Sequence, residues 1–380
     1  MNKTSGIIRQ VLVLTAMLVG CIAVPSYGLA TNVLFTVDVC WTCGSDFKGG
    51  WNGKEYGVPL IVEILERHGI KGVFFVSPYC PPGLENDMIS HLRFLTARGH
   101  DLQLHTHPDV FDVNRPLLTM YDKEEKRKII AAGVRNIILA GAPPPIAHRA
   151  GAYALDDEVM GLPAEFGIHI DSSVFPGSPN CKVALPRSAA NRFTKIGGVY
   201  ELPITLIELL PFIGYAGTTQ LSLDRTVWLQ QRAALEKLAD QNVPVATIFL
   251  HFSSLYKHRP AQRAYEPHIV TGPDLDNIEA LGNMAKLVST DARFKPVTVR
   301  ELWAIHEADP KALEGPAVIP YVGIWPTYVA CVQQFFGHST AKKLVALAPI
   351  VLVLGAAGVI WLTLRARRRR ERVEDHPVRQ

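Results

Sequence analysis

The sequence predicts an α/β protein in which helices cover a parallel β-sheet. Short runs rich in β-branched and aromatic residues alternate with longer segments whose apolar residues recur at helical spacing. This alternation repeats over about residues 31–308, which is typical of a doubly wound sheet or a (β/α) barrel. The sequence contains neither GxGxxG nor GxxxxGK[ST], which disfavours the nucleotide-binding versions of these folds.

Four strand and helix pairs are expected in the first half of this segment. The run 32–39 reads NVLFTVDV and predicts a buried strand, and the helical pattern after it closes on Gly69. A later helix begins at Asn86 and closes on Gly99 in the same way. The expected strands are 32–39, 72–77, 101–107 and 146–149, and the expected helices are 58–69, 86–99, 122–140 and 155–166.

The second half continues the pattern after an irregular stretch rich in Pro and Gly. Its strongest strand signal is 245–252, which reads VATIFLHF. The remaining expected strands are 168–174 and 199–205, and the expected helices are 224–240 and 274–288.

A transmembrane helix is predicted near the C-terminus. Leu344 to Leu364 form an uncharged run of 21 residues, long enough to cross a bilayer core of about 30 Å. Arginines crowd the following segment, 365–380, and place it in the cytoplasm. We therefore expect a transmembrane helix at 342–364, a Pro-rich spacer at 309–341 and an extracytoplasmic domain at 31–308.

The N-terminus resembles a secretory signal peptide. Lys3 and Arg9 precede an apolar run at 11–24, and small residues then allow cleavage after Ala30, so residues 1–30 are excluded from the fold. Two alternatives remain open. The sequence around Cys21 (LVGC) resembles a lipoprotein acylation site, and an uncleaved segment would act as an anchor.

Charge and cysteine content narrow the function further. The formal net charge is +4, and the tail 365–380 supplies it, with seven Arg against three acidic residues (7 − 3 = +4). The domain is thus balanced, and nucleic acid is not an expected partner. Cys40, Cys43, Cys80 and Cys181 allow three disulfide pairings in an oxidising compartment. A redox role for Cys40 and Cys43 is disfavoured because the pair does not open a helix.

Ionisable residues collect where the predicted strands end. Because such groups are costly in apolar strands, they indicate a shared site at the carboxyl edge of the sheet. The set suits metal-assisted hydrolysis, with Asp38 as the base and His251 as the acid. Arg149 is expected to keep Asp38 ionised, and Asp171 to contact His251. The members are Asp38, His105, His107, His148, Arg149, Asp171 and His251.

These residues resemble the motifs of the polysaccharide deacetylase family, the NodB-homology carbohydrate esterases. The motifs are Thr36-Val37-Asp38, GHDLQLHT at 99–106, HRAGAY at 148–153, DSSV at 171–174 and Leu250-His251. The similarity covers about residues 32–305. It implies a distorted (β/α) barrel that removes acetyl groups from glycans with the help of a divalent metal. It also implies Asp38 as base, Arg149 as its orienting partner, His251 as acid and a backbone N–H near Tyr153 as an oxyanion donor.

The metal ligands depart from the family pattern. A second carboxylate is expected after Asp38, yet Val39 and Cys40 follow it. The predicted metal ligands are His105 together with either His107 or Asp109, and the choice between these two stays open. A Cys40 thiolate would favour zinc over magnesium or calcium.

The functional prediction is thus a membrane-anchored, extracytoplasmic hydrolase acting on a polysaccharide or envelope glycan, with zinc the expected metal. The alternatives are a hydrolase of another amide or ester and a non-catalytic descendant that binds sugar. Trp41 follows the first predicted strand and is expected to stack on a sugar ring, with ordinary loop packing as the alternative. The sequence does not identify the glycan, the bond type, the oligomeric state or a protein partner.

Overall fold

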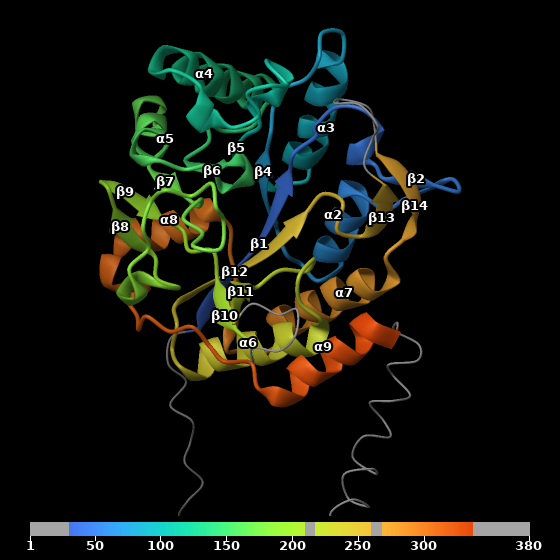
Figure 1. The fold of residues 1–380 in the computed structure, drawn as a ribbon, viewed down its shortest axis with the longest axis vertical. Helices are drawn as coiled ribbons and strands as arrows, with labels where there is room; N and C mark the ends of the chain where they lie inside the picture. The colour runs from blue at the N-terminus through green and yellow to red at the C-terminus, as the bar shows by residue number, and fades with distance from the viewer. Residues whose placement is uncertain (1–29, 210–216, 260–267, 337–380) are drawn as a thin grey trace, which may run out of the picture.

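The computed structural model describes residues 30–209, 217–259 and 268–336 (Figure 1). Within these ranges a curled sheet of nine strands forms the centre of the molecule, and helices surround it. The strand order is β12-β1-β4-β5-β6-β7-β9-β8, with β15 paired to β1. All ladders except β8 with β9 are parallel, which confirms the predicted α/β class.

The strands of this sheet differ in length, and the two longest, β1 and β12, lie side by side at one end of the strand order. Their bounds are β1 (Thr31–Val39), β4 (Val73–Val76), β5 (Asp101–Thr106), β6 (Ala147–Ala150), β7 (Ile170–Asp171), β8 (Thr194–Ile196), β9 (Val199–Glu201), β12 (Val245–His251) and β15 (Phe294–Pro296). Three small hairpins flank the sheet: β2 (Gly50–Trp51) with β3 (Lys54–Glu55), β10 (Leu206–Glu208) with β11 (Thr218–Gln220), and β13 (Tyr256–Arg259) with β14 (Ile269–Pro273).

The helices as far as α7 fall in the expected places between strands, and α8 and α9 were not expected. They are α2 (Val58–Arg67), α3 (Glu85–Ala97), α4 (Lys123–Leu139), α5 (Asp157–Gly161), α6 (Trp228–Asp240), α7 (Leu275–Thr290), α8 (Val299–Ala308) and α9 (Ile324–Phe336). Local signals set several boundaries. Asp122 caps α4 in a capping box with Glu125, and Thr298 caps α8 with Glu301.

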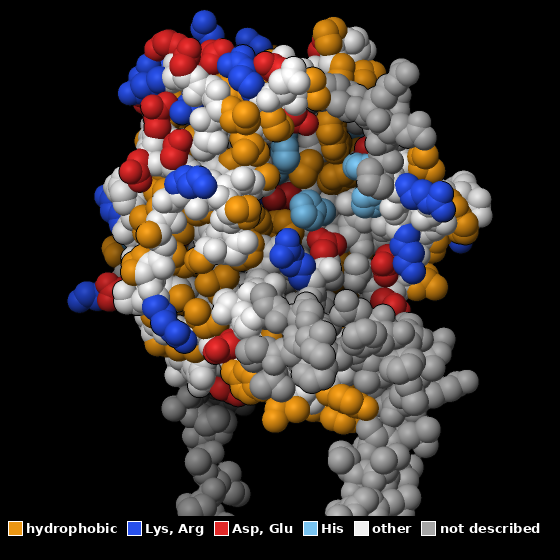
Figure 2. All heavy atoms as spheres, viewed as in Figure 1, with side chains coloured by type: hydrophobic (Ala, Val, Ile, Leu, Met, Phe, Trp, Pro, Cys, Tyr) orange, Lys and Arg blue, Asp and Glu red, His pale blue; other side chains and the backbone are white. Residues whose placement is uncertain are grey.

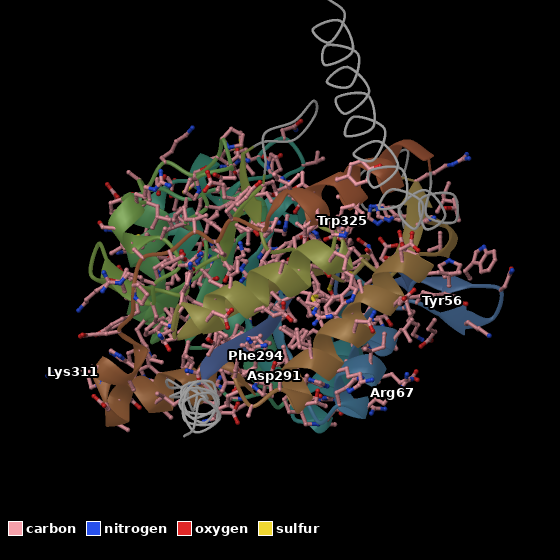
Figure 3. All side chains as sticks on the ribbon, turned by 90° about the horizontal axis from the view of Figure 1, so that it is seen from below. Tyr56, Arg67, Asp291, Phe294, Lys311 and Trp325 are labelled. Carbon is pink, nitrogen blue, oxygen red and sulfur yellow. The ribbon has the colours of Figure 1, made fainter. Side chains whose placement is uncertain are left out.

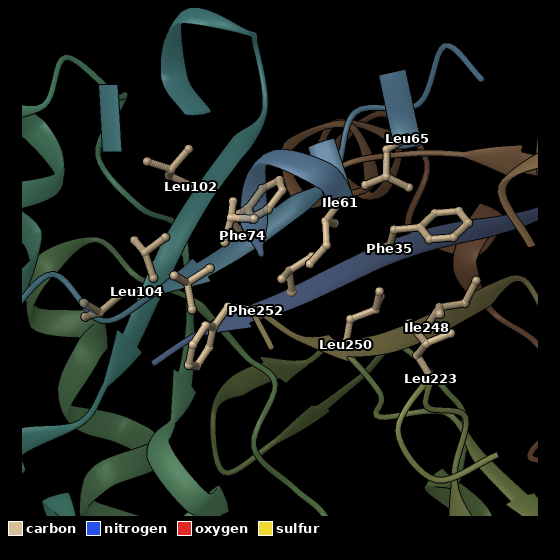
Figure 4. Packing of buried hydrophobic residues seen from close by; sticks show 14 of the residues in the cluster. Phe35, Ile61, Leu65, Phe74, Leu102, Leu104, Leu223, Ile248, Leu250 and Phe252 are labelled. Atoms are coloured by element: carbon tan, nitrogen blue, oxygen red, sulfur yellow. The ribbon is translucent and has the colours of Figure 1, made fainter. Parts of the chain in front are cut away.

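Alternation along the strands separates two packed faces. On β1, Phe35 and Val37 face the helices, whereas Leu34 faces the inside of the curl. The helix-facing layer includes Phe74, Leu104 and Leu250, which belong to the same buried cluster as Ile61 and Leu65 of α2 (Figure 4). Each such buried side chain contributes about 1.5–3 kcal/mol to stability. The opposite, inner face is closed at the amino ends of the strands by α8 and Leu313.

The sheet is curled but its ladder is open between β9 and β12 in the described part of the chain. Irregular chain fills this gap: Ser222 forms a parallel bridge to Phe249, and Leu221 N–H donates to the Thr205 carbonyl at 2.7 Å. The predicted barrel is therefore a partial one. The short β7 and β9 explain the break, because two or three residues make too few ladder bonds to continue the curve.

Residues 310–336 lie in the predicted spacer but form structure of their own. A 3₁₀ turn at Pro310–Leu313 buries Leu313 against α8, and α9 packs on α6. Glu208 N–H donates to the Pro320 carbonyl at 2.9 Å, and Val322 N–H donates to the Glu208 carbonyl at 3.0 Å. This part of the chain is thus attached to the domain along β10.

No helix in the described ranges has the length and apolar character needed to cross a membrane. The predicted transmembrane helix at 342–364, the tail 365–380 and residues 1–29 of the predicted signal peptide lie outside the described residues. Cys40, Cys43, Cys80 and Cys181 carry free thiols.

Candidate functional site

The inner face of the sheet brings the predicted base together with its neighbours. In the strand register Asp38 lies opposite His251 of β12 and Phe75 of β4. His105 of β5 lies opposite Arg149 of β6 in the same way. Because side chains on a strand alternate between faces, all five point to the same side, near the carboxyl ends of their strands.

Asp38 forms a buried ion pair with Arg149. The guanidinium Nη1 donates to Asp38 Oδ1 at 2.7 Å and to Thr36 Oγ1 at 3.2 Å. The other guanidinium nitrogens donate to Ser172. Arg149 Nε donates to the Ser172 carbonyl at 3.1 Å, and Nη2 donates to the Ser172 hydroxyl at 2.9 Å. The guanidinium also lies 4.0 Å from the centre of the Phe75 ring. These contacts fix the orientation of the Arg149 guanidinium and of the Asp38 carboxylate.

The pKa of Asp38 follows from this pairing. Burial by itself would raise the pKa of the carboxyl, but Arg149 and the nearby imidazoles of His105 and His251 bring the pKa below its ordinary value. Asp38 is therefore ionised at neutral pH, which a general base requires.

His105 presents one ring nitrogen to the site. Its Nδ1 lies 2.7 Å from the Arg149 carbonyl, and since a carbonyl only accepts, Nδ1 carries the proton. The lone pair is then on Nε2, which lies 3.7 Å from Cys40 Sγ and 3.8 Å from Asp38 Oδ2. This is the tautomer that a metal ligand needs, with its second nitrogen held by a backbone carbonyl.

Cys40, His105 and His107 form a group that can hold a metal ion. Their ligand atoms all lie within 4.8 Å of one another. A tetrahedral ion with Zn–S of 2.3 Å and Zn–N of about 2.0 Å would place sulphur and nitrogen about 3.6 Å apart. The observed 3.7 Å between Cys40 and His105 fits that spacing. One thiolate, two imidazoles and an open fourth position form a donor set suited to catalytic zinc.

Asp109, the alternative ligand to His107, lies outside this group. Pro108 begins a 3₁₀ turn directly after β5, so His105 and Asp109 do not share a helical turn. The Asp109 carboxylate lies 3.9 Å from His107 Nδ1 and outside the group of three. It is placed to orient His107, and Cys40 completes the group of three that could hold a metal ion.

Burial controls the protonation of the three ligands. It lowers the pKa of His105 to about 4 and, with His105 adding to the effect, that of His107 to about 3, so both rings are neutral at pH 7. Burial and the charge of Asp38 raise the pKa of the Cys40 thiol well above its ordinary value. Metal binding would thus release a proton from Cys40.

His251 lies on the solvent-exposed side of the site and is paired with the Asp224 carboxylate. Its Nδ1 lies 3.1 Å from Asp224 Oδ2, and its ring meets Phe249 edge to face. Burial would lower the pKa of His251, but the hydrogen bond and charge of Asp224, helped by Asp38, raise it above the ordinary value. An imidazole with a raised pKa, held at Nδ1 by a carboxylate, is suited to donate a proton from its other nitrogen.

The prediction that Asp171 contacts His251 is wrong. Asp171 lies opposite His148 and Glu201 in the register, on the helix-facing side of the sheet. Its Oδ2 is 3.1 Å from His148 Nδ1 and accepts from the Ser173 hydroxyl at 3.0 Å. Burial and Asp171 raise the pKa of Glu201 well above its ordinary value. These buried side chains connect β6 and β7 on the face of the sheet away from the site.

The predicted substrate contacts lie at the edges of the site. Tyr153 is the last residue of a turn in which Ala152 and Tyr153 both adopt positive φ (52° and 54°). The Tyr153 hydroxyl donates to Gln220 Oε1 at 3.1 Å. Gly151 is required before Ala152 because an added Cβ would meet the Thr106 carbonyl at 2.4 Å. Trp41 lies in the cleft wall next to Cys40.

An open cleft of about 750 Å³ reaches Cys40, His107 and His251 from solvent, whereas Asp38 and His105 lie behind its lining. Figure 2 shows the histidines gathered on this face of the molecule, beside acidic side chains. The lining residues are Cys40, Trp41, His107, Asp109, Asp224, His251, Phe252, Ser253, Ser254, Tyr256, Lys257, His258, His268, Asp274 and Asn277.

Sequence reasoning missed Asp224 and Ser172. Asp224 was expected to begin a helix, but α6 starts at Trp228 and Asp224 lies in the preceding turn, where its N–H donates to Ser222 Oγ at 3.1 Å. Nothing in the local sequence marks it as the partner of His251, which is 27 residues away. Ser172 lies next to Asp171 in a predicted strand, so alternation alone allowed one of the two to face the site.

No family model matches the sequence, and no curated protein matches it. Among solved structures, a Mycobacterium smegmatis protein provisionally assigned as a polysaccharide deacetylase is similar at 18% identity, with 78% of this chain and 96% of that chain covered and a TM-score of 0.47. The 4-alpha-glucanotransferase of Thermococcus litoralis is similar at 16% identity, with 80% and 44% covered and a TM-score of 0.48. A family 4 carbohydrate esterase pseudoenzyme of Bacillus anthracis is similar at 15% identity, with 72% and 65% covered and a TM-score of 0.40.

A protein provisionally assigned as a polysaccharide deacetylase and a pseudoenzyme of carbohydrate esterase family 4 are among the solved structures that this chain resembles. Similarity at this level carries no information about activity, and the structures include an enzyme of another class and a protein described as a pseudoenzyme. The chemistry is inferred below from the side chains of the site.

Proposed function

We propose that this chain is a metal-dependent hydrolase that removes acetyl groups from an extracytoplasmic polysaccharide or envelope glycan. One observation carries the proposal. An ionised carboxylate, a three-residue metal group and a histidine backed by a carboxylate meet at one edge of the sheet. A protein that only binds sugar has no need for a base and an acid on either side of a metal group.

The metal group supports zinc as the cofactor, held by Cys40, His105 and His107. When bound, zinc would act as a Lewis acid toward the acetyl carbonyl and the attacking water. Asp38 Oδ2 lies 3.8 Å from His105 Nε2, so the carboxylate faces the same small space as the ligands. Arg149 occupies Oδ1 and leaves Oδ2 to take the proton of the water.

His251 is assigned as the acid. Adjacent parallel strands are about 4.8 Å apart, and Asp38 and His251 are register partners on such strands. Asp38 takes one proton from water as the C–O bond forms, and His251 gives one to the leaving nitrogen or oxygen as the acetyl bond breaks. The products are acetate and the free amine or hydroxyl. The backbone N–H near Tyr153 is proposed to stabilise the oxyanion.

The setting of the reaction is also part of the proposal. The uncharged run 344–364 with its arginine-rich flank supports a single C-terminal membrane anchor, with the domain outside the cytoplasm and the tail inside. The expected substrate is therefore a polymer of the envelope, which the open cleft can admit at an internal unit.

Acetate release by the purified full chain from acetylated amino-sugar oligomers tests the activity. We expect release that a chelator abolishes and Zn²⁺ restores. Asp38→Ala and His251→Ala should lose about 10²- to 10⁴-fold in turnover while keeping their metal, and His105→Ala should lose the metal. Tight glycan binding without acetate release or bound metal would instead identify a sugar-binding module.

A further inference from the structure

The first turn of α9 exposes an apolar, aromatic face. Ile324 is 66% exposed, and Trp325 and Tyr328 are each 42% exposed. Thr327 and Val329 are buried on the two flanks of this face and Ala330 is buried opposite it, and α9 packs on α6. Hydrophobic side chains are visible at the lower edge of the molecule in Figure 2, where Figure 1 places α9.

The aromatic residues of this face are organised. The rings of Trp325 and Tyr328 stack with centroids 5.6 Å apart, and Tyr321 is exposed directly before the helix. Lys237 of α6 donates to the Tyr321 carbonyl and lies 5.6 Å from the centre of the Tyr321 ring. Trp and Tyr beside Lys are the side chains that collect where hydrocarbon meets lipid headgroups.

The sequence after α9 indicates what covers this face. The helix ends at Phe336, and the uncharged run begins at Leu344. The seven residues 337–343 span at most about 25 Å even when fully extended. If the run crosses a bilayer, the aromatic face is therefore tethered next to the outer surface of that bilayer. Lys342 and Lys343 precede the run and suit contact with lipid headgroups.

We propose that Tyr321, Ile324, Trp325 and Tyr328 seat the domain on the outer surface of the membrane that its C-terminal segment crosses. The inference rests on the membrane anchor of the proposed function. α9 would lie in the interface with its apolar side a few Å into the headgroup region. Figure 3, viewed from below, shows Trp325 at this end of the molecule. The histidines of the cleft lie higher on the face seen in Figure 2, so the cleft would open at the side of the domain, above the lipid surface.

Quenching by brominated lipid tests the seat. The full chain is reconstituted in phosphatidylcholine and phosphatidylglycerol vesicles with bromines at acyl positions 6 and 7. We expect Trp325→Phe to reduce the bromolipid-quenched part of the tryptophan emission. Trp51→Phe, in β2 and far from α9 in Figure 1, is the matched control and should leave that part unchanged.

Trp361, inside the predicted span, separates the two proposals. If Trp361→Phe reduces quenching and Trp325→Phe does not, the anchor stands and the seat is overturned; a second copy of the chain or the N-terminal apolar run would then cover α9. If neither substitution changes quenching and the protein leaves the vesicles at alkaline pH, the anchor and the seat both fail. Reduction by both substitutions supports the seat.

Discussion

Arg149 has no exposed surface, and its charge is balanced chiefly by Asp38. Removing one partner from a buried pair leaves the other charge without compensation, which costs more than the pair itself contributes. The two residues are therefore coupled in stability as well as in chemistry. Their coupling can be measured without any substrate.

We expect Arg149→Met to lower the free energy of unfolding by about 3–5 kcal/mol, because Asp38 is left ionised and buried. Adding Asp38→Asn should recover part of this loss, since the uncompensated charge is gone. Denaturant unfolding of the two single variants and the double variant measures the coupling. Losses that simply add would show that the pair is not coupled.

The pH dependence of turnover should report His251. As an acid it must be protonated, and because Asp224 raises the pKa of His251, activity should persist above the ordinary His range and fall as pH rises through that raised value. Asp224→Asn should shift this alkaline limb to lower pH. The acid limb, set by Asp38 with its lowered pKa, should not move.

The matched control for that profile is Asp171→Asn. Asp171 faces the opposite side of the sheet and pairs with His148, so it should leave the alkaline limb in place. A shift as large as that of Asp224→Asn would mean that the assignment of the two carboxylates is reversed.

At the scale of elements, strand periodicity decides which polar residues share the site. His148 and Arg149 are adjacent in β6, so their side chains face opposite sides of the sheet, and only one of the two can reach the site. The sequence allowed this conclusion in part, but the face of Asp171 depended on the register of β7, which no local pattern reveals.

Apart from the short hairpin β2–β3, the strands and α-helices up to residue 140 were predicted within two residues, because strong alternation and glycine-closed helices mark them. Prediction failed for α8 and α9. The capping box of Thr298 and Glu301 was a usable signal for α8. α9 lies in a Pro-rich stretch whose order depends on packing against α6 and β10, which are remote in sequence.

The turn after β6 gives a prediction about the metal. An added Cβ at Gly151 would meet the His107 ring at 3.0 Å as well as the Thr106 carbonyl, so Gly151→Ala should displace His107. We expect metal affinity to fall about 10- to 100-fold, measured by competition with a chromophoric chelator. Gly161→Ala, where the added Cβ meets nothing within 4 Å, is the control and should bind normally.

At the scale of the whole molecule, the curl of the sheet sets base, metal group and acid along one open edge. Residues from β1, β5, β6 and β12 meet there although they are up to 213 positions apart in the chain (251 − 38). Their convergence was predicted from the rule that parallel strands end at one edge. The sequence also raised a Cys40 thiolate as a ligand, but it left His107 and Asp109 as open alternatives, because the path of the chain after β5 depends on the turn at Pro108.

Because the metal group exists only in the folded chain, metal should stabilise the whole domain. At a free zinc concentration of 100 times Kd we expect about 2.7 kcal/mol of added stability. Thermal unfolding with and without zinc, with Cys40→Ser as the comparison, measures this. If zinc stabilised the Cys40→Ser variant as much as the unaltered chain, the zinc would bind at another site.

Zinc X-ray absorption of the purified full chain tests the central claim most directly, because it reads the donor atoms around the ion. With Cys40, His105 and His107 as ligands, the spectrum should show about one sulphur at 2.3 Å and nitrogens at 2.0–2.1 Å, and the sulphur should vanish in Cys40→Ser. A protein that binds no zinc, or a zinc shell without sulphur in the unaltered chain, would contradict the account.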